Sequence, residues 1–397
     1  DDIHKQGFKG VMIGTQPKPL DYSLYCKLIT NNSWAESRKQ MGYKDMTNKR
    51  LLVSLAGKPY VDIRRCFNSF LLQSVDSSLS NKLINQEIKY LDKNPAQFDK
   101  VEFNVVVNCY YFDKKRMSNH LTKNLKINKI NSNKIIKLYS NWTRDLIANS
   151  NKNFKDIANN YLILNKELGN INFSKKSSIF ELSFKLNQIV DLCIKKGVIP
   201  FSIHARCAFI ALQILSSFEK QNIFSPTDYN NFLKNISTIS SEFNEDLHRF
   251  LSKKISKKYF IDKYGHLRPS TYDITSKNYK QMIDENFFKK DNLSYNSSKS
   301  SSSISKKIWK KNSKKIINLL KYEKIKLDES ELYQFIVNSI KGREKGKYEF
   351  TKCVNKILEI IKIFSNKLNL SKEDIQFYSI EDFLNFENIN FNNFSFF

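Results

Sequence analysis

Apolar residues recur at three- and four-residue intervals through most of the chain beyond about Asn131. This spacing places apolar side chains on one face of a helix and is typical of amphipathic helices. It is clear in "NKIIKLYSNWTRDLIANSNKNFKDIANNYLILNKEL", "SIFELSFKLNQIVDLCIKKG" and "IHARCAFIALQILSSFEKQ". The pattern returns in "DESELYQFIVNSI" and "KYEFTKCVNKILEIIKIFSNKL", so helices are predicted over the greater part of the chain.

Individual residues predict where several helices begin and end. Gly197 and Pro200 are expected to end one helix before the next begins, because glycine favours helix C-termini and proline interrupts helical hydrogen bonds. Ser225 and Pro226 predict the N-cap and the first residue of a further helix. "SKED" at Ser371 predicts a capping box in which an aspartate takes the usual place of glutamate.

The N-terminal part mixes strand patterns with turn signals. "IGTQPKPLDYSLY" places two prolines, which favour extended backbone, before a helix expected from Asp21 or Ser23. "RLLVSLAGKPYVDIR" has two short apolar runs around Gly57, which predicts a β-hairpin. In "VEFNVVVNCYYFD" apolar side chains alternate from Val101 to Cys109, so a third strand is predicted.

Together the patterns predict an α+β fold that is predominantly α-helical, with a small antiparallel sheet near the N-terminus followed by a helical bundle. A helix over 77–92 is expected to cover the sheet. We expect a mixed α/β part over 1–125, a helical core over 126–285, a Ser/Lys-rich linker or long loop over 286–307, and a C-terminal helical part over 308–397.

The composition is that of a folded protein, because 41% of the 397 residues are hydrophobic and 13% are aromatic. The longest apolar runs are too short to span a membrane, and "DDIHKQGFKG" lacks the apolar region of a secretory signal, so we expect a cytoplasmic protein. The start without Met predicts a piece of a longer protein. Six scattered cysteines form no CxxC pair, which predicts buried reduced thiols and no metal site.

The formal net charge of +27 would suit a partner rich in phosphate. The lysines are spread along the whole chain, however, and accompany abundant Asn and Ile, which like Lys have A/T-rich codons. Much of the charge is therefore expected on solvated faces, and nucleic-acid binding is not favoured.

Only ten of the 66 basic residues are arginine, so each arginine can mark a position that needs a bidentate guanidinium. A buried ion pair that stabilises the fold is an equal alternative for each. The candidates are Arg64, Arg65, Arg206, Arg268 and Arg343.

The stretch "YGHLRPSTYDI" holds the strongest candidate site. His266 and Arg268 can direct an imidazole and a guanidinium toward one anionic group, and we take them as catalytic candidates. Tyr264, Tyr272 and Asp273 are candidates for substrate binding. The alternative is that His266 and Arg268 hold the turn together by bonding backbone carbonyls and Asp273.

Two further places could contribute to a binding site. "DIRRCFNSF" is expected to bring Arg64, Asn68 and Ser69 to a strand end, which could form a ligand rim or an ordinary strand-to-loop cap. Arg206, with His204, begins a buried-looking helix, where an anion would be favoured near the N-terminus. A side chain held within the core is as well supported by the pattern.

The sequence contains no GxGxxG, no GxxxxGK[ST], no HExxH and no GxSxG motif. With ten glycines it offers no glycine-rich loop that could bind phosphates through backbone amides. We therefore expect no cofactor or metal on this chain, and any ATP to be bound elsewhere.

Six blocks in order resemble the central region of phosphoenolpyruvate-synthase-like phosphotransferases: "IGTQPKPLDYSLY", "LLVSLAGKPYVDIRRCFNSF", "KVEFNVVVNCY", "IHARCAFIALQIL", "YGHLRPSTYDI" and "IKGREKGKYEFTK". These proteins are related to pyruvate phosphate dikinase and rifampicin phosphotransferase, and "YGHLRP" is similar to a turn of the latter. In this sequence Leu267 and Arg268 replace the Arg-Gly order of that turn. Nothing resembles the TIM-barrel domain of true phosphoenolpyruvate synthases.

The resemblance implies a helical substrate domain between an ATP-grasp domain and a swivelling phosphohistidine domain, both of which this chain lacks. ATP and Mg²⁺ would serve the parent enzyme, and the phosphohistidine would deliver phosphate to a small molecule near Tyr264, His266 and Arg268. The alternatives are a noncatalytic basic α-rich binding or scaffold module for an anionic partner such as RNA, and a pseudoenzyme that keeps the fold without activity.

Overall fold

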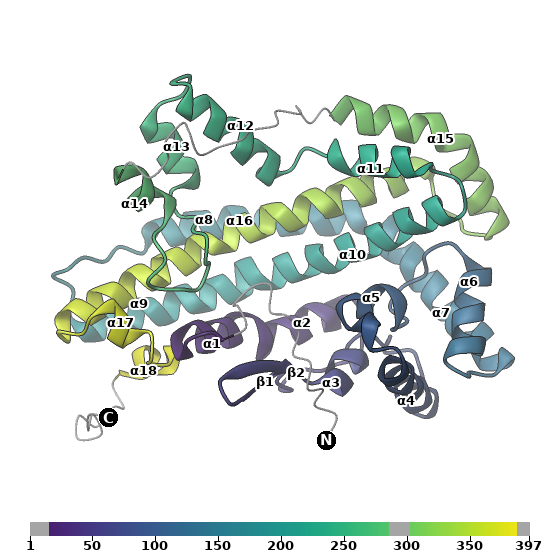
Figure 1. Cartoon of the computed structure of the whole chain (residues 1–397), viewed down its shortest axis with the longest axis horizontal. Coiled ribbons are helices and arrows are strands. Elements are labelled where there is room, and N and C mark those ends of the chain that lie inside the picture. The colour runs from purple at the N-terminus through teal and green to yellow at the C-terminus, as the bar shows by residue number, and fades with distance from the viewer. Residues whose placement is uncertain (1–15, 286–301, 387–397) are drawn as a thin grey trace.

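The computed structural model describes residues 16–285 and 302–386 and is predominantly helical (Figure 1). A two-stranded antiparallel sheet lies near the N-terminus and is followed by helices, so the predicted fold class is confirmed. The elements up to residue 170 are α1 (Pro19–Tyr25), η1 (Cys26–Thr30), α2 (Ser33–Gln40), β1 (Leu52–Leu55), β2 (Lys58–Val61), α3 (Ile63–Asn68), α4 (Ser77–Lys93), η2 (Pro95–Lys100), α5 (Val101–Asn104), α6 (Lys114–Asn119), η3 (His120–Asn124), α7 (Lys129–Ala148) and α8 (Ser150–Asn170).

The described residues of the second half form helices and the turns and loops that join them. Figure 1 shows α10 and α16 crossing the middle of the molecule between the N-terminal elements and a group formed by α11 to α15. The elements are α9 (Ile179–Leu192), η4 (Cys193–Val198), α10 (Ile199–Lys220), α11 (Pro226–Lys234), α12 (Ile239–Leu251), α13 (Lys257–Tyr264), α14 (Tyr279–Asp284), α15 (Ser302–Tyr322), α16 (Glu329–Lys367), α17 (Lys372–Ile375) and α18 (Ile380–Leu384).

The predicted hairpin and helix caps are confirmed. β1 pairs with β2 in antiparallel register across a turn in which Ala56 and Gly57 both have positive φ. The Ser225 side chain caps α11 and Pro226 is its first residue. Ser371 and Asp374 form the predicted capping box of α17. These features agree with the sequence because each depends on residues close together in the chain.

The predicted third strand is wrong. Val101–Asn104 forms the short helix α5, and the residues that follow it form a buried loop. Side chains take the place of a partner strand in this loop. The Glu87 carboxyl oxygen accepts a hydrogen bond from the backbone N–H of Val107 at 2.9 Å, and the Thr143 hydroxyl oxygen accepts one from the N–H of Tyr110 at 2.9 Å.

The predicted break at Gly197 and Pro200 is also wrong, because α9, η4 and α10 form one continuous helical segment. Pro200 lies in the first turn of α10, and the π-helical turn η4 before it accommodates the missing N–H. A Cβ atom on Gly197 would lie 2.9 Å from the Cβ of Phe350. This glycine therefore allows α16 to approach and does not end a helix.

α16 is the 39-residue helix around which the second half is organised. It packs along α10 and also contacts α7, α8, α9, α12 and α15. At Gly346 an added Cβ would lie 2.5 Å from the Tyr161 hydroxyl and 3.2 Å from the Cα of Phe201. The absence of a side chain at this position lets three helices meet closely.

Residues 286–301 of the predicted linker lie outside the described residues, whereas residues 302–307 belong to α15. The predicted division of the chain at residues 125, 285 and 307 stays a prediction. All six cysteines are free thiols, and all but the half-buried Cys66 are buried, as expected.

Within the described residues one segment, Ile179–Lys220, is long and apolar enough to cross a membrane by length and composition. In its most apolar window 61% of the residues are buried inside the molecule. It is the central core segment α9–η4–α10, and a core helix of a soluble protein has the same properties.

Candidate functional site

The "YGHLRP" stretch lies where the turn after α13 meets the middle of α16, and a cavity of ≈ 270 Å³ opens there. We call it the turn cavity. Its volume is close to the lower end of the range for small-molecule sites. It is lined by Ile239, Ser240, Phe243, Asn244, Tyr264, His266, Leu267, Arg268, Pro269, Thr271, Tyr279, Glu344, Lys347, Tyr348 and Thr351.

Backbone hydrogen bonds fold the chain tightly between α13 and α14. The N–H of Leu267 donates to the carbonyl of Tyr264, and the N–H of Tyr279 donates to the carbonyl of Leu267 at 2.8 Å. The N–H of Lys280 donates to the carbonyl of Gly265. The side chains of His266 and Arg268 are thereby directed toward α16.

His266 is a neutral imidazole at the wall of the turn cavity. Its Nε2 donates to the carbonyl of Tyr348 at 3.2 Å, and its ring lies edge-on to the Tyr348 ring. Burial, followed by the nearby positive charge of Lys352, lowers the pKa of His266 to about 4. Among the described residues no hydrogen bond is found to Nδ1, so this nitrogen can accept a proton or hydrogen bond from a ligand.

Arg268 is buried and bonded to its surroundings. Its Nη2 donates to Oδ1 of Asn355 on α16 at 2.5 Å, and its Nη1 is 3.4 Å from the carbonyl oxygens of Asp273 and Ser276. Burial lowers the pKa of Arg268 to about 10 despite the negative charge of Glu359 nearby. These bonds hold the turn against α16, which was the alternative role for this residue.

Tyr264 contributes its ring to the turn cavity, while its hydroxyl is bonded elsewhere. The hydroxyl donates to Oδ2 of Asp246 at 3.1 Å, and the same carboxylate binds Lys263 at 2.9 Å and Arg249 at 3.1 Å. The pKa of Asp246 is lowered because Lys263 and Tyr264 outweigh its burial. Tyr264 therefore shapes the cavity and links it to an ion-paired cluster behind.

Tyr272 and Asp273 do not line the turn cavity. Tyr272 is buried in another part of the core, where its ring packs edge-on against Tyr25 at 5.4 Å. Asp273 accepts hydrogen bonds at Oδ1 from the backbone and hydroxyl of Thr275, at 2.7 and 2.6 Å. Both residues stabilise the segment that follows the turn.

Arg64, Asn68 and Ser69 lie on or just after α3, which begins directly after β2 with Asp62 as its N-cap. The Arg64 guanidinium donates to Oδ1 of Asn85 at 2.9 Å, and the Asn68 amide donates to the carbonyl of Arg64. The expected strand end is therefore a helix cap, and these residues are not brought to the turn cavity.

Arg206 is buried in the core beside Phe70 and does not line the turn cavity. Its Nη1 pairs with Oε2 of Glu102 at 2.6 Å, and its guanidinium lies 5.0 Å from the centre of the Phe70 ring. The Arg38 guanidinium lies 4.2 Å from the centre of the same Phe70 ring, and it donates a hydrogen bond to the Ser69 hydroxyl. Arg206 therefore belongs to a buried structural cluster.

The residues on α16 that face the turn were missed as site candidates. The Glu344 carboxylate accepts a hydrogen bond from the Ser240 hydroxyl at 3.0 Å, and the exposed Lys347 forms no ion pair within the described residues. They lie in "IKGREKGKYEFTK", so the order of the blocks was the signal that could have indicated them. The cavity thus offers a carboxylate, an ammonium, a neutral imidazole and aromatic walls to a small polar molecule.

In the part of the chain that the structure describes, no three His, Cys, Asp or Glu residues are grouped as a metal site would require. Comparisons of the chain with protein-family models, curated proteins and solved structures found no match. The resemblance to phosphoenolpyruvate-synthase-like phosphotransferases therefore remains a prediction that rests on the six sequence blocks.

Proposed function

We propose that this chain is the substrate-binding and docking domain of an ATP-dependent phosphotransferase, with the turn cavity as its substrate site. One observation carries the proposal. Two of the six resembling blocks, "YGHLRPSTYDI" and "IKGREKGKYEFTK", are far apart in sequence and yet line the same cavity. A shared cavity is the expected result if both blocks serve one site.

The proposed roles follow from the side chains. His266 accepts a hydrogen bond from a substrate hydroxyl at Nδ1, and its neutral state at physiological pH permits this. Glu344 and Lys347 bind polar groups of the substrate, since both line the cavity. Arg268 is a positioning residue, because its guanidinium holds the turn on α16 through Asn355.

The remaining parts of the reaction belong to other domains in this proposal. An ATP-grasp domain binds ATP and Mg²⁺ and cleaves ATP to AMP, with one phosphoryl group passing to the histidine of the swivelling domain and the other passing to water as inorganic phosphate. The N–P bond of the phosphohistidine then breaks as its phosphoryl group passes to the substrate hydroxyl, whose proton is lost. The chain binds no cofactor itself, and the parent protein is cytoplasmic. The substrate is a small molecule whose polar group matches the charges of Glu344 and Lys347.

The test uses the native protein that contains this chain, supplied with ATP, Mg²⁺ and fractions of a small-molecule extract. AMP release that depends on one fraction is expected. His266→Ala and Glu344→Gln should reduce it about tenfold or more, while Lys258→Ala, an exposed residue of α13 outside the cavity, should not change it. Circular dichroism establishes that each variant is folded.

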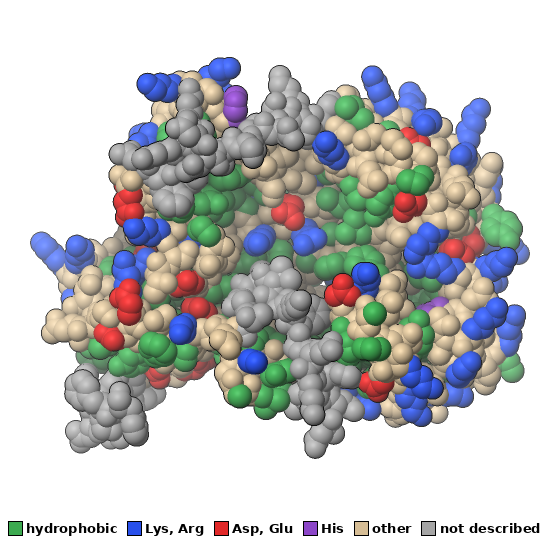
Figure 2. Space-filling view, viewed as in Figure 1, with side chains coloured by type: hydrophobic (Ala, Val, Ile, Leu, Met, Phe, Trp, Pro, Cys, Tyr) green, Lys and Arg blue, Asp and Glu red, His purple; other side chains and the backbone are tan. Residues whose placement is uncertain are grey.

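Unchanged AMP release in both cavity variants would overturn the site. No AMP release, together with polyanion binding that weakens steeply with salt, would favour the noncatalytic binding module. Figure 2 shows Lys and Arg side chains spread over the visible face and not gathered in one patch, so this face offers that alternative no particular surface.

A further inference from the structure

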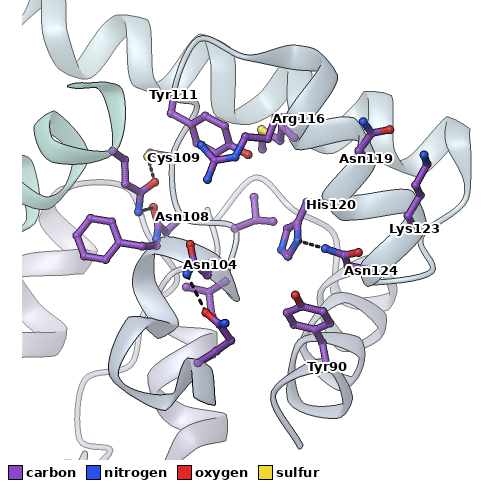
Figure 3. Close-up of a pocket in the computed structure, with 16 residues that line it drawn as sticks. Tyr90, Asn104, Asn108, Cys109, Tyr111, Arg116, Asn119, His120, Lys123 and Asn124 are labelled. Atoms are coloured by element: carbon purple, nitrogen blue, oxygen red, sulfur yellow. Dashed lines mark hydrogen bonds between the residues drawn. The ribbon is translucent and has the colours of Figure 1, made fainter. Parts of the chain in front are cut away.

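A second cavity, of ≈ 360 Å³, lies among α4, α5, α6, η3 and the buried loop after α5 (Figure 3). We call it the α6–η3 cavity. Its volume is within the range of about 300–1,000 Å³ that is usual for small-molecule sites. It shares no lining residue with the turn cavity.

One helical face supplies the basic side of the α6–η3 cavity. Arg116, His120 and Lys123 follow one another at four- and three-residue spacing across α6 and the π-helical turn η3, so they lie on the same face. π-Helical turns are frequent at functional sites. The same spacing of Arg116, His120 and Lys123 can be seen in the sequence "RMSNHLTKN", which was not among the predicted sites.

The sixteen residues that line the α6–η3 cavity include Arg116 and Lys123 but no carboxylate. Within residues 16–285 and 302–386, the Arg116 guanidinium forms no ion pair and no hydrogen bond, and it lies 4.8 Å from the centre of the Tyr111 ring. The nearby Asp113 carboxylate is used to cap α6, where it accepts the backbone N–H of Arg116. A half-buried guanidinium that forms no ion pair is a ready partner for an anion.

A second basic side chain, Lys220, lies near Arg116. Both residues line a small recess that adjoins the α6–η3 cavity. Burial and then the charge of Arg116 lower the pKa of Lys220, while Glu219 and Asp113 partly oppose this. An anion bound between these two cations would relieve their repulsion.

The uncharged groups of the cavity suit a flat polar ring. His120 is neutral, because burial lowers its pKa, and its Nε2 donates to the carbonyl of Val105 at 2.9 Å. Its Nδ1 accepts from Asn124 at 3.1 Å. Figure 3 shows Tyr111 and Arg116 at one end of the opening and Tyr90 at the other, with Asn104 across from His120. The aromatic side chains at these positions can stack on a flat ring of a ligand, and the amides can form hydrogen bonds with the edge of that ring.

We propose that the α6–η3 cavity binds a small phosphomonoester whose organic part is a flat polar ring, with the phosphate at Arg116 and the ring between Tyr111 and Tyr90. The loop after α5 forms a preorganised wall, since the Glu87 carboxyl, Thr143 hydroxyl and His120 imidazole hold its backbone. The proposal is independent of the function assigned to the turn cavity.

The test is calorimetric titration of the whole chain with a panel of flat-ringed phosphomonoesters: AMP, GMP, CMP, UMP and pyridoxal 5′-phosphate. Inorganic phosphate and adenosine serve as half-probes. We expect at least one panel member to bind with Kd below about 1 mM and more tightly than either half-probe. Arg116→Ala should weaken that binding about tenfold or more, because a charge-assisted bond to phosphate is lost.

Lys115→Ala is the matched control, because Lys115 is exposed on the same helix and does not line the cavity. It should leave the affinity unchanged. Arg116→Lys keeps the charge but loses the planar fork, so an intermediate affinity is expected, and thermal unfolding establishes that each variant is folded. The proposal is overturned if no panel member binds, if phosphate alone binds equally well, or if Arg116→Ala binds like the parent.

Discussion

The turn cavity and the α6–η3 cavity use arginine in opposite ways. At the turn cavity Arg268 is buried and bonded to Asn355 and backbone carbonyls, and a carboxylate, Glu344, lines the same space. At the α6–η3 cavity the Arg116 guanidinium lies over the Tyr111 ring and forms no ion pair or hydrogen bond among the described residues, and no carboxylate lines the space. An arginine in a conspicuous motif can thus serve the fold, while one in an ordinary helix is left without an ion pair among the described residues.

The largest predicted difference in stability is between variants of Arg268 and Arg116. Arg268→Met should lower the free energy of unfolding by about 3 kcal/mol, since the buried Asn355 oxygen loses one of its two donors and the half-buried carbonyls of Asp273 and Ser276 lose theirs. Arg116→Met should change it by no more than about 0.5 kcal/mol. Urea unfolding measures both values, and equal losses would contradict the distinction.

A second prediction tests the packing that supports the turn cavity from α16. Gly346→Ala should lower the free energy of unfolding by about 2 kcal/mol, because its Cβ would press on the Tyr161 hydroxyl and on Phe201. Gly169→Ala is the matched control, since its Cβ would meet no atom within 4 Å on α8. It should stabilise the protein by up to about 1 kcal/mol. A similar sign for both variants in chemical denaturation would show that α16 is not closely packed at Gly346.

A third prediction concerns the wall of the α6–η3 cavity. Burial raises the pKa of Glu87 to about 8, whereas an unfolded glutamate titrates near about 4.3. Between these pH values the folded state holds one more proton than the unfolded state, so this residue lowers stability as pH rises. Relative to the parent, Glu87→Gln should gain at least about 1 kcal/mol between pH about 5 and about 8.

Thermal unfolding of both proteins across this pH range measures the difference. Glutamine keeps an oxygen that can accept the N–H of Val107, so the loop should remain in place. A stability difference between the two proteins that does not vary with pH would show that Glu87 ionises normally in the folded state.

The smallest effect is expected at the open side of the turn cavity. Lys347 is exposed and Glu344 is bonded to an exposed serine, so Lys347→Ala and Glu344→Gln should each change the free energy of unfolding by less than about 0.5 kcal/mol. Differential scanning calorimetry checks this. A large loss in either variant would mean that these side chains support the fold, as Arg268 does, and are not free for a ligand.

The confirmed sequence predictions depend on local interactions. The cap at Ser225 and the box of Ser371 with Asp374 join residues three positions apart, and the hairpin turn at Gly57 joins adjacent strands. Each of these interactions is specified by residue types within a few positions of each other. Local chemistry was therefore sufficient to predict them.

The wrong predictions depend on distant residues. The alternation from Val101 to Cys109 satisfied a strand pattern, but Glu87 and Thr143 bond the backbone of the loop that follows α5. Gly197 looked like a helix end, but it faces Phe350 on α16. In both cases the partner lies far along the chain, so the pattern around the residue could not reveal it.

The candidate site was predicted in part. The turn motif drew attention to Tyr264, His266 and Arg268, which do line one cavity. The motif also contains Tyr272 and Asp273, whose side chains make contacts outside this cavity. Closeness in sequence does not determine the direction of a side chain, since neighbouring residues in a turn point to different parts of the core.

The sequence by itself determined that this chain is mainly helical, where several helices begin, and that a hairpin lies near the N-terminus, because periodicity, caps and turns are properties of short segments. Only the tertiary structure decided which arginines are paired and which are left without a partner. That outcome depends on which distant carboxylates, amides and carbonyls the packing of α10 and α16 brings within hydrogen-bonding distance.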